Sequence, residues 1–522
     1  MDDRLVVYAK LLALESRRLM LISDALAILF FFAQIFFSIA TALFAVSSLD
    51  DLYFDALFFL RYRCGRIDAG HRHKPVRLKD MVNLPEQPLA IMLPAWEEAE
   101  VLTQSVSNII HSVAYKNFHI FIGTYPNDSQ TRAQADHLAA EYAKVHNVIT
   151  PLPGPTCKAD CLNAIIAAIG MHEKFNGMRF AGYVLHDAED IVHPFSLHLY
   201  NYYLPRYELV QIPVLSLPRK WFDFTGGHYM DEFAEAHTKE MITRQRFAGV
   251  VPGAGVGTAY SARAIEFASG SGEIFNTGSL TEDYDFSFRL SAAGMRQIFA
   301  RIPAGDPQDG LGRAFNHGPW NPSDIVATRE FFPNAFWAAV RQKTRWFIGI
   351  SLQGWQLLGW RGAWTIKYLF WRDRKMLFFS HAIVLGLLAF LIFAAFWVYH
   401  AIDPQGYRMA PLMAEDNPFW YVVYFNLFML VYRILQRSWW TGQCYGLASI
   451  PLIIPRYVWG SIINYLATVR AIKIFFTCAM AGKPIGWDKT AHEFPTQLHP
   501  VPLTRESGTF AASSVGNSMP EH

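Results

Sequence analysis

The sequence predicts an α/β fold in which a doubly wound parallel domain is joined to an α-helical transmembrane region. Strand-like and helix-like segments alternate from Leu89 to Pro194, which is typical of a parallel sheet with helices on both faces. Two long runs, Ala25–Leu49 and Met376–Ile402, contain no Asp, Glu, Lys or Arg. Each run is long enough to cross the hydrocarbon core of a bilayer, so both are predicted transmembrane helices.

The rest of the apolar sequence is less regular. Hydrophobic residues make up 52% of the 522 residues, which is high for a soluble protein. The segment Asn417–Tyr432 is predicted to be a further span. The segment Ser438–Val469 contains Arg456 and two prolines, so it is either a span or a broken, re-entrant element.

The charges indicate orientation and exclude some partners. Seven Lys and Arg against two acids lie between Arg61 and Asp80, whereas the loop from His400 to Pro418 has three acids and one Arg. The large middle segment is therefore predicted to be cytoplasmic. A net charge of +2 without a basic, aromatic face argues against a nucleic-acid partner. The five cysteines form no CxxC pair, so we expect neither disulfides nor structural zinc.

The elements follow in order along the chain. An interfacial helix over Leu52–Leu60 and a basic linker precede the soluble domain. Within that domain we expect a buried strand from Leu89 that ends in a turn at Pro94, and then the strand His119–Thr124, the helix Ala133–Lys144, the turn Pro153–Pro155, the helix Ala159–Ile169 and a strand beginning at Tyr183.

Carboxylates gather where these strands end. Asp187, Glu189 and Asp190 follow the last strand, and clustered carboxylate oxygens suit a hard divalent ion that holds phosphates. The alternative is a solvated acidic turn. Asp128 ends an earlier strand and is expected either to meet Asp187 in the same crevice or to form an Asx turn. Lys158 begins a helix, where it is either a phosphate ligand or a solvated surface lysine.

Four later segments contain residues of possible functional importance. The acidic helix Asp231–His237 is interpreted as a solvated face, and the glycine-rich run Val251–Thr258 as a tight turn that admits close backbone approach, because it lacks the lysine of a P-loop. Thr281 is a predicted N-cap before three acids. Gln342, Arg345 and Trp346 share one helix face, which suits a sugar ring and a charged leaving group or an interfacial helix on the membrane; both can hold together.

Three of these motifs resemble a known family. Asp187-Ala-Glu189, Thr281-Glu282-Asp283 and Gln342-x-x-Arg345-Trp346 occur in the order and approximate spacing of processive, membrane-embedded family 2 glycosyltransferases, the group of cellulose, hyaluronan and chitin synthases. A bacterial inner-membrane branch of this group is more closely similar from about Ser47 to Pro495. That resemblance rests on four segments: Gly123–Asp128, Gly154–Asn163, Pro252–Thr258 and Trp487–Pro495.

The resemblance implies a GT-A fold for the cytoplasmic domain and a role for each matching residue. Nucleotide binding is implied for Pro94, Glu97, Asp128, Lys158 and Asp187. Asp187 and Glu189 would hold Mg²⁺ or Mn²⁺ on the diphosphate, with Asp190 as a helper. Asp283, beside Glu282, would be the general base for the acceptor hydroxyl. Gln342, Arg345 and Trp346 would bind the acceptor end and the leaving diphosphate.

The implied activity is inverting transfer from a UDP-sugar to a growing cell-surface polysaccharide by a multi-pass protein of the bacterial inner membrane. The alternatives are transfer of one sugar to a polyprenyl phosphate, and a non-catalytic scaffold for envelope assembly or phage adsorption. Implied partners are the UDP-sugar, a glycan or lipid-linked acceptor, the lipid bilayer and an outer-membrane export partner. The expected domains are an anchor with interfacial helix (1–60), a basic linker (61–88), the catalytic domain (89–322), interfacial helices (323–375), transmembrane helices (376–472) and a cytoplasmic C-terminal segment (473–522).

Overall fold

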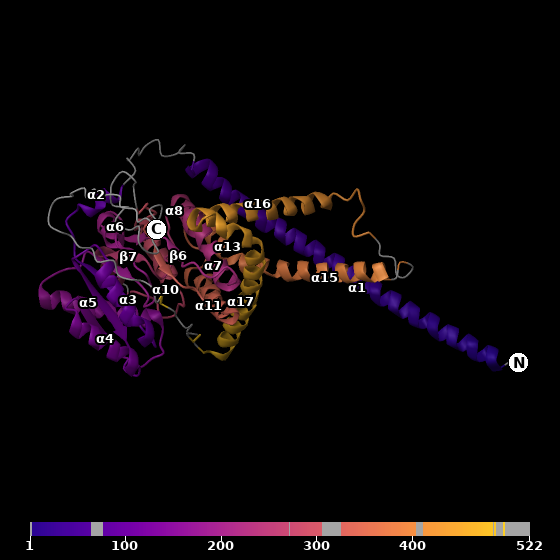
Figure 1. Ribbon diagram of the computed structural model, residues 1–522, viewed down its shortest axis with the longest axis horizontal. Coiled ribbons are helices and arrows are strands. Elements are labelled where there is room, and N and C mark those ends of the chain that lie inside the picture. The colour runs from indigo at the N-terminus through magenta and orange to yellow at the C-terminus, as the bar shows by residue number, and fades with distance from the viewer. Residues whose placement is uncertain are drawn as a thin grey trace, which may run out of the picture.

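The structure is a computed structural model that describes residues 3–63, 77–270, 272–304, 325–402, 404, 411–483, 485–486 and 494–495. An α/β domain forms one end of the molecule, and long helices extend from it (Figure 1). Most of the C-terminal segment, including residues 487–493 of the predicted Trp487–Pro495 motif, lies outside the described residues. Phe494 packs against the core of the α/β domain, which puts this point of the chain on the catalytic-domain side.

A seven-stranded sheet forms the centre of the domain, in the order β3-β2-β1-β4-β7-β5-β8. Pairing is parallel from β3 to β4, whereas β7 runs antiparallel to both of its neighbours. β5 and β8 are again parallel. The strands are β1 (Leu89–Pro94), β2 (Phe118–Thr124), β3 (Val145–Ile149), β4 (Gly182–Leu185), β5 (Leu209–Gln211), β7 (Thr258–Ser261) and β8 (Gln297–Phe299).

Helices cover both faces of this sheet, as the sequence predicts for a doubly wound domain. Along β1, Ile91 and Leu93 belong to one buried cluster, and Ala90 and Met92 belong to the other. Because side chains alternate between the faces of a strand, this division shows a core on each side. The main helices are α3 (Ala99–Ser112), α4 (Ser129–Glu141), α5 (Lys158–Asn176), α6 (Ser196–Tyr203), α9 (Ala262–Ser269) and α10 (Glu282–Ala292).

Both expected helices differ at their boundaries: α4 ends at Glu141 rather than Lys144, and α5 begins one residue earlier than expected, at Lys158. α4 begins at Ser129 rather than Ala133, because Asp128 accepts a hydrogen bond from the backbone N–H of Thr131 and caps the helix. α5 continues past Ile169 to Asn176, where Gly177 adopts a φ of 62° that a glycine tolerates and that ends the helix. Apolar periodicity fades before these ends, so capping residues set them.

Four helical segments are long and apolar enough to cross a membrane: Met20–Leu60, Trp364–Ile402, Phe419–Tyr445 and Leu447–Ala481. They contain α1 (Asp3–Ala56), α15 (His381–Ile402), α16 (Phe419–Tyr445) and α17 (Ile453–Ala481). α15 packs along α1, with Phe30 edge-on to Phe393 and Phe396 (Figure 1). The segment Ser438–Val469 is broken at Gly446, and a short 3-10 helix, η5 (Leu447–Leu452), precedes α17.

The expected interfacial helix Leu52–Leu60 is not a separate element. α1 runs without a break to Ala56 and passes directly into a π-helical turn, η1 (Leu57–Arg63). In the predicted linker, the helix α2 (Leu78–Val82) packs on the core of the α/β domain through Leu78 and Met81. The domain boundaries proposed from the sequence otherwise remain predictions.

The acidic stretch Asp231–His237 is buried, so its interpretation as a solvated face is wrong. It lies on α7 (Phe224–Glu235) and the π-helical turn η2 (Ala236–Glu240). Cations from other helices pair with these acids: Arg456 of α17 lies 2.8 Å from Asp231, and Lys343 of α11 (Phe336–Trp346) lies 2.5 Å from Glu232. We call this set the α7 ion network: Asp231, Glu232, Glu235, Lys239, Lys343, Arg433, Arg437 and Arg456.

Candidate active site

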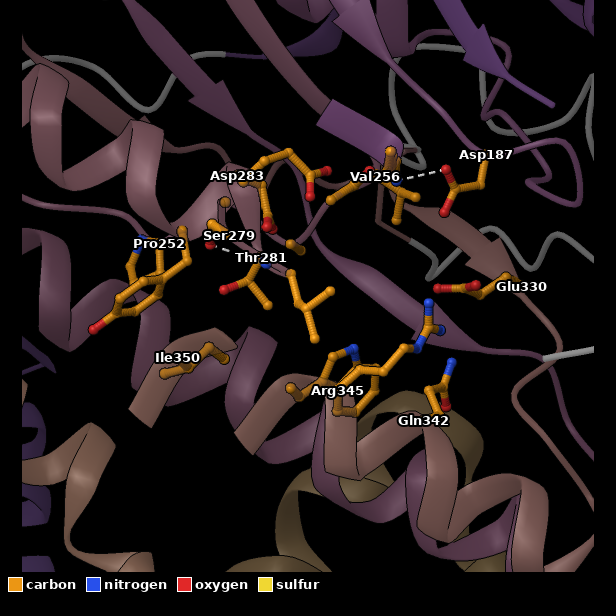
Figure 2. A pocket seen from close by; sticks show the side chains of 18 of the residues that line it. Asp187, Pro252, Val256, Ser279, Thr281, Asp283, Glu330, Gln342, Arg345 and Ile350 are labelled. Atoms are coloured by element: carbon orange, nitrogen blue, oxygen red, sulfur yellow. Dashed lines mark hydrogen bonds and ion pairs between the residues drawn. The ribbon is translucent and has the colours of Figure 1, made fainter. Parts of the chain in front are cut away.

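A cavity of about 350 Å³ lies where the carboxyl ends of β1 and β4 meet α10, α11 and η2. This volume falls within the range of small-molecule sites in proteins. Figure 2 shows side chains from these separate elements pointing into one space. Among the predicted site residues, the following line it: Pro94, Lys158, Asp187, Glu189, Glu282, Asp283, Gln342, Arg345 and Trp346.

The turn after β4 presents Asp187 and Glu189 to the cavity. Asp190 is fully enclosed and does not line the cavity; its Oδ2 accepts a hydrogen bond from the backbone N–H of Asp187 at 3.1 Å and lies 2.8 Å from His186 Nδ1. Burial raises the pKa of Asp190, and His186 acts in the opposite direction. Asp190 therefore holds the turn that aims Asp187, rather than facing a ligand itself.

Lys158 stands at the first position of α5, and its side chain is enclosed. Its Nζ lies 2.6 Å from Asp187 Oδ1, with side-chain exposures of 18% and 27%, and donates to the carbonyl of Gly255 at 2.9 Å. The interpretation as a solvated surface lysine is therefore wrong. Burial disfavours the charged ammonium, but Asp187 and Glu282 outweigh it and raise the pKa of Lys158. A cation thus sits at the helix start, where phosphate is favoured.

Asp283 lies at the start of α10, against the glycine-rich turn. A Cβ placed on Gly255 would lie 3.5 Å from Asp283 Oδ2 and 3.6 Å from Lys158 Nζ, and the φ of Gly255 is 76°. The positive φ favours glycine here, and the turn lies beside both charged groups; the predicted close approach of this turn to a ligand or acceptor stays a prediction. Burial raises the pKa of Asp283 to about 6 and that of Glu282 to about 7, and Lys158 lowers both.

Thr281 precedes this helix at the N-cap position, but its hydroxyl makes no capping hydrogen bond. It instead meets the π-helical turn η4 (Phe347–Gln353) that follows α11: a Cβ on Gly349 would lie 2.4 Å from Thr281 Oγ1. Gln353 reinforces the contact by accepting from the N–H of Leu280 and donating to the carbonyl of Gly278. The two motif-bearing helices are thereby fixed against each other.

Gln342, Arg345 and Trp346 of α11 form the opposite wall, so the predicted shared face is confirmed. Trp346 packs edge-on against Tyr229 and Phe332. Gln342 Oε1 is buried and has no hydrogen-bond partner among the described residues. A buried acceptor without a hydrogen bond is energetically unfavourable. This wall therefore offers the Gln342 Oε1 atom as a hydrogen-bond acceptor for a ligand in the cavity.

Glu330 is a cavity residue that the sequence analysis missed. It ends β9 (Thr328–Glu330), which pairs in parallel with β6 (Val214–Ser216). Figure 2 shows Glu330 between Asp187 on one side and Arg345 and Gln342 on the other. Burial and the nearby Asp190 and Glu189 carboxylates raise its pKa well above the ordinary range for glutamate. One glutamate in a three-residue strand carries no pattern that would single it out.

Two predicted nucleotide residues, Glu97 and Asp128, are not among the cavity-lining residues. Both carboxylate oxygens of Asp128 accept from backbone N–H groups, that of Glu97 at 2.6 Å and that of Thr131 at 3.2 Å. Asp128 thus has the local turn role that was its alternative, and it does not meet Asp187. Its contact with a nucleotide stays a prediction, as does that of Glu97.

The carboxylates of this cavity fit a hard divalent cation. Asp187, Glu189 and Glu330 offer only oxygen donors, and burial together with the Asp190 and Glu189 carboxylates raises the pKa of Glu330. Carboxylate oxygens are the ligands that Mg²⁺ and Mn²⁺ prefer. The oxygens of these three residues do not all lie within 4.8 Å of one another, so their side chains would close around an ion on binding.

Comparison with known proteins gives one family match and two close relatives. The model of the family described as "Glycosyltransferase like family 2" matches residues 85–349. Bacteriophage adsorption protein B of Escherichia coli K12 and bacteriophage N4 adsorption protein B of E. coli O157:H7 are each 38% identical over 457 residues. The match covers 86% of this chain and 61% of each relative, so the chain spans less than two thirds of their length.

Solved structures are similar at a lower level. The mannosyltransferase PcManGT from Pyrobaculum calidifontis, solved with GDP-Man and Mn²⁺, is 13% identical with a TM-score of 0.45, covering 81% of this chain and 99% of that one. Glucosyl-3-phosphoglycerate synthase from Mycobacterium tuberculosis, solved with Mn²⁺, UDP and phosphoglyceric acid, is 15% identical with a TM-score of 0.24, covering 37% and 63%.

Proposed function

Because the chain belongs to the glycosyltransferase-like family 2, we propose that it transfers sugar from a UDP-sugar to a growing cell-surface polysaccharide, with inversion at the transferred carbon. One observation carries the proposal. The diphosphate side, with Asp187, Glu189 and Lys158, and the acceptor side, with Asp283 and the Gln342 face, open into the same cavity. A transferase needs both sides at one point, whereas a scaffold needs neither.

The residues have complementary tasks in the reaction. Asp283 takes the proton of the acceptor hydroxyl as its oxygen bonds to the anomeric carbon, while the bond from that carbon to the phosphate oxygen breaks. Lys158 and Arg345 offset the charge that develops on the leaving diphosphate. Glu282 adds a second carboxyl beside the base. A divalent cation held by Asp187 and Glu189, with Glu330 beside them, would supply Lewis-acid stabilisation of the diphosphate.

The membrane helices support a surface polymer as the product. α17 packs along α7 and α11, so the helix that bears Gln342, Arg345 and Trp346 is attached directly to a candidate span. We propose that the protein lies in the bacterial inner membrane with the catalytic domain cytoplasmic. The charge asymmetry around Arg61–Asp80 supports that orientation.

The test is sugar transfer by the purified full chain in nanodiscs, with a panel of UDP-sugars and Mg²⁺ or Mn²⁺. We expect UDP release with a long saccharide product, lost in Asp283→Asn and retained in Glu141→Gln, a matched acid-to-amide change on the exposed end of α4. If the product is instead a single sugar attached to added polyprenyl phosphate, the acceptor is a lipid and the polymer proposal is wrong. UDP binding without turnover on any acceptor would favour a non-catalytic envelope role, which fits the name of the relatives, bacteriophage adsorption protein B.

A further inference from the structure

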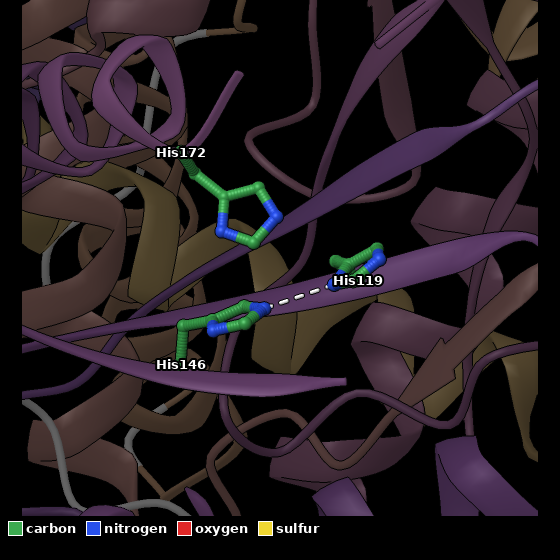
Figure 3. Close-up of side chains that lie close together, drawn as sticks. All are labelled: His119, His146 and His172. Carbon is green, nitrogen blue, oxygen red and sulfur yellow. Dashed lines mark hydrogen bonds between the residues drawn. The ribbon is translucent and has the colours of Figure 1, made fainter. Parts of the chain in front are cut away.

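Three histidines converge at the end of the sheet away from the cavity (Figure 3). His119 comes from β2, His146 from β3 and His172 from α5. One imidazole nitrogen of each lies within 4.8 Å of the others, and all three rings are partly exposed. Nothing in the proposed transfer reaction uses this cluster.

Strand register and helix packing bring these residues together. Phe121 of β2 pairs with His146 of β3, so their side chains share one face of the sheet. His119 precedes Phe121 by two residues and therefore points to that same face. α5 covers this face and contributes His172 from its last turns. Phe121 and Phe180 pack beside the imidazoles, with ring centroids 4.7 Å apart for Phe121 and His146.

The nitrogens of the cluster are incompletely satisfied. His119 Nδ1 lies 2.9 Å from His146 Nε2, with the two ring planes only 16° apart, so one proton joins the two rings. His172 Nε2 is buried and has no hydrogen-bond partner among the described residues. An unpaired buried nitrogen is unfavourable, and a ligand for that nitrogen would remove the penalty.

We propose that His119, His146 and His172 together bind one divalent transition-metal ion of the Zn²⁺, Ni²⁺ or Cu²⁺ class. Three imidazoles without a carboxylate among them select these borderline ions over Mg²⁺ or Ca²⁺. In a tetrahedral zinc site with bonds of about 2.0–2.1 Å, ligand nitrogens lie roughly 3.3 Å apart. The 2.9 Å pair therefore opens slightly, and the third ring moves inward.

One cation near the cluster opposes a bound metal ion. The Lys144 ammonium donates to the carbonyl of Lys116, and its charge adds to burial in lowering the pKa of His119.

The metal would act on the fold rather than on the chemistry. Fourteen residues of α5 separate His172 from Lys158, which is roughly 21 Å of helix. An ion shared by β2, β3 and α5 would fasten this helix to the sheet at one end while Lys158 serves the cavity at the other. The expectation of no structural zinc rested on the spacing of the cysteines. That criterion does not detect a site built from histidines on three separate elements.

The test is a Co²⁺ titration of the full chain in detergent after chelator treatment, with millimolar Mg²⁺ present to occupy the carboxylate site. We expect one equivalent of Co²⁺ with the visible absorption of a four-coordinate ion, displaced by Zn²⁺. His119→Gln, His146→Gln and His172→Gln should each weaken binding at least about tenfold. His137→Gln, on the exposed surface of α4, should leave it unchanged.

Stability gives a second readout. Zn²⁺ should raise the temperature of the cooperative thermal transition in the wild type and in His137→Gln, but not in the three cluster variants, because an ion that binds only the native state stabilises it. Co²⁺ binding that survives in all three variants, or that disappears in Glu189→Gln instead, would overturn the proposal. Absence of binding by the wild type would overturn it as well, and none of these results depends on sugar transfer.

Discussion

Lys158 Nζ lies 2.6 Å from Asp187 Oδ1, so the proposed phosphate-binding cation and a proposed metal-binding carboxylate form an ion pair. Asp187 raises the pKa of Lys158 and so helps to keep its ammonium charged in the cavity. For a diphosphate to be held by Lys158, this pair has to loosen, and a cation on Asp187 would compensate the carboxylate.

Removal of the Lys158 charge is expected to weaken nucleotide binding. Hydrogen bonds to charged groups contribute about 1.5–3 kcal/mol, so Lys158→Met should raise the Kd for UDP by about 10- to 100-fold. Calorimetric titration of UDP in the presence of Mg²⁺ measures this. Lys174→Met, on the exposed last turn of the same helix, is the control and should not change the Kd.

The reaction should have an acidic limb that belongs to Asp283. Burial raises the pKa of this carboxyl to about 6, and the ionised form is the base. Activity should therefore be constant near pH 8 and fall about tenfold per pH unit below 6. The pH dependence of kcat/KM measures the limb. The Lys158 ammonium lowers the pKa of Asp283, so in Lys158→Met the residual kcat/KM should begin to fall at a higher pH than in the wild type. If kcat/KM falls at the same pH in both proteins, this coupling is contradicted.

The tight contact between Gly349 and Thr281 should be essential for activity. A Cβ on Gly349 would lie 2.4 Å from Thr281 Oγ1, so Gly349→Ala must push η4 and α11 away from the start of α10. We expect kcat to fall by about 100-fold, since a shift of about 1 Å at a catalytic site costs that much. Gly170→Ala is the control, because nothing lies within 4 Å of its Cβ and alanine favours the interior of α5.

Breaking the pair between Lys343 and Glu232 should destabilise the whole protein. Lys343→Met leaves the partly exposed Glu232 carboxylate without its nearest cation, and loss of a hydrogen bond to a charged group costs about 1.5–3 kcal/mol. Thermal unfolding in detergent measures the loss. The double variant Lys343→Met/Glu232→Gln should recover part of it, and a double variant no better than the single one would contradict the assignment.

The same pair should give stability a dependence on pH. Burial alone would raise the pKa of Glu232, but Lys343 and neighbouring cations lower it to about 2. A carboxyl with a lowered folded-state pKa stabilises the native state above its unfolded value near 4.5, and this contribution disappears as pH falls toward 2. In Lys343→Met, this part of the pH dependence should become smaller, because Arg437 remains as the other cation that lowers the pKa of Glu232.

The sequence predicted those parts of the fold and site that local patterns encode. The alternation from Leu89 to Pro194 reports a doubly wound sheet because each strand and helix carries its own periodicity. Asp187, Asp283 and the Gln342 face could be identified from the sequence because each belongs to a short contiguous motif. The antiparallel β7 was not predicted, since a four-residue buried strand has the same composition in either direction.

Other features depend on partners far away in the chain. Glu330 enters the cavity only because β9 pairs with β6, more than one hundred residues earlier. The acids of α7 look solvated by composition, and their burial depends on cations of α11, α16 and α17. A local pattern contains neither the pairing nor the counter-ion, so these residues needed the tertiary structure.

The α7 ion network also determines when the active site can form during synthesis. Lys343, on the helix that bears Gln342 and Arg345, is held by Glu232 and by Asn464 of α17. Arg456, also on α17, neutralises Asp231. Until α17 has been synthesised, Asp231 lacks the Arg456 guanidinium and Lys343 lacks Asn464, although the cavity residues named above have already been made. The acceptor wall therefore gains its full set of contacts only after α17 has docked.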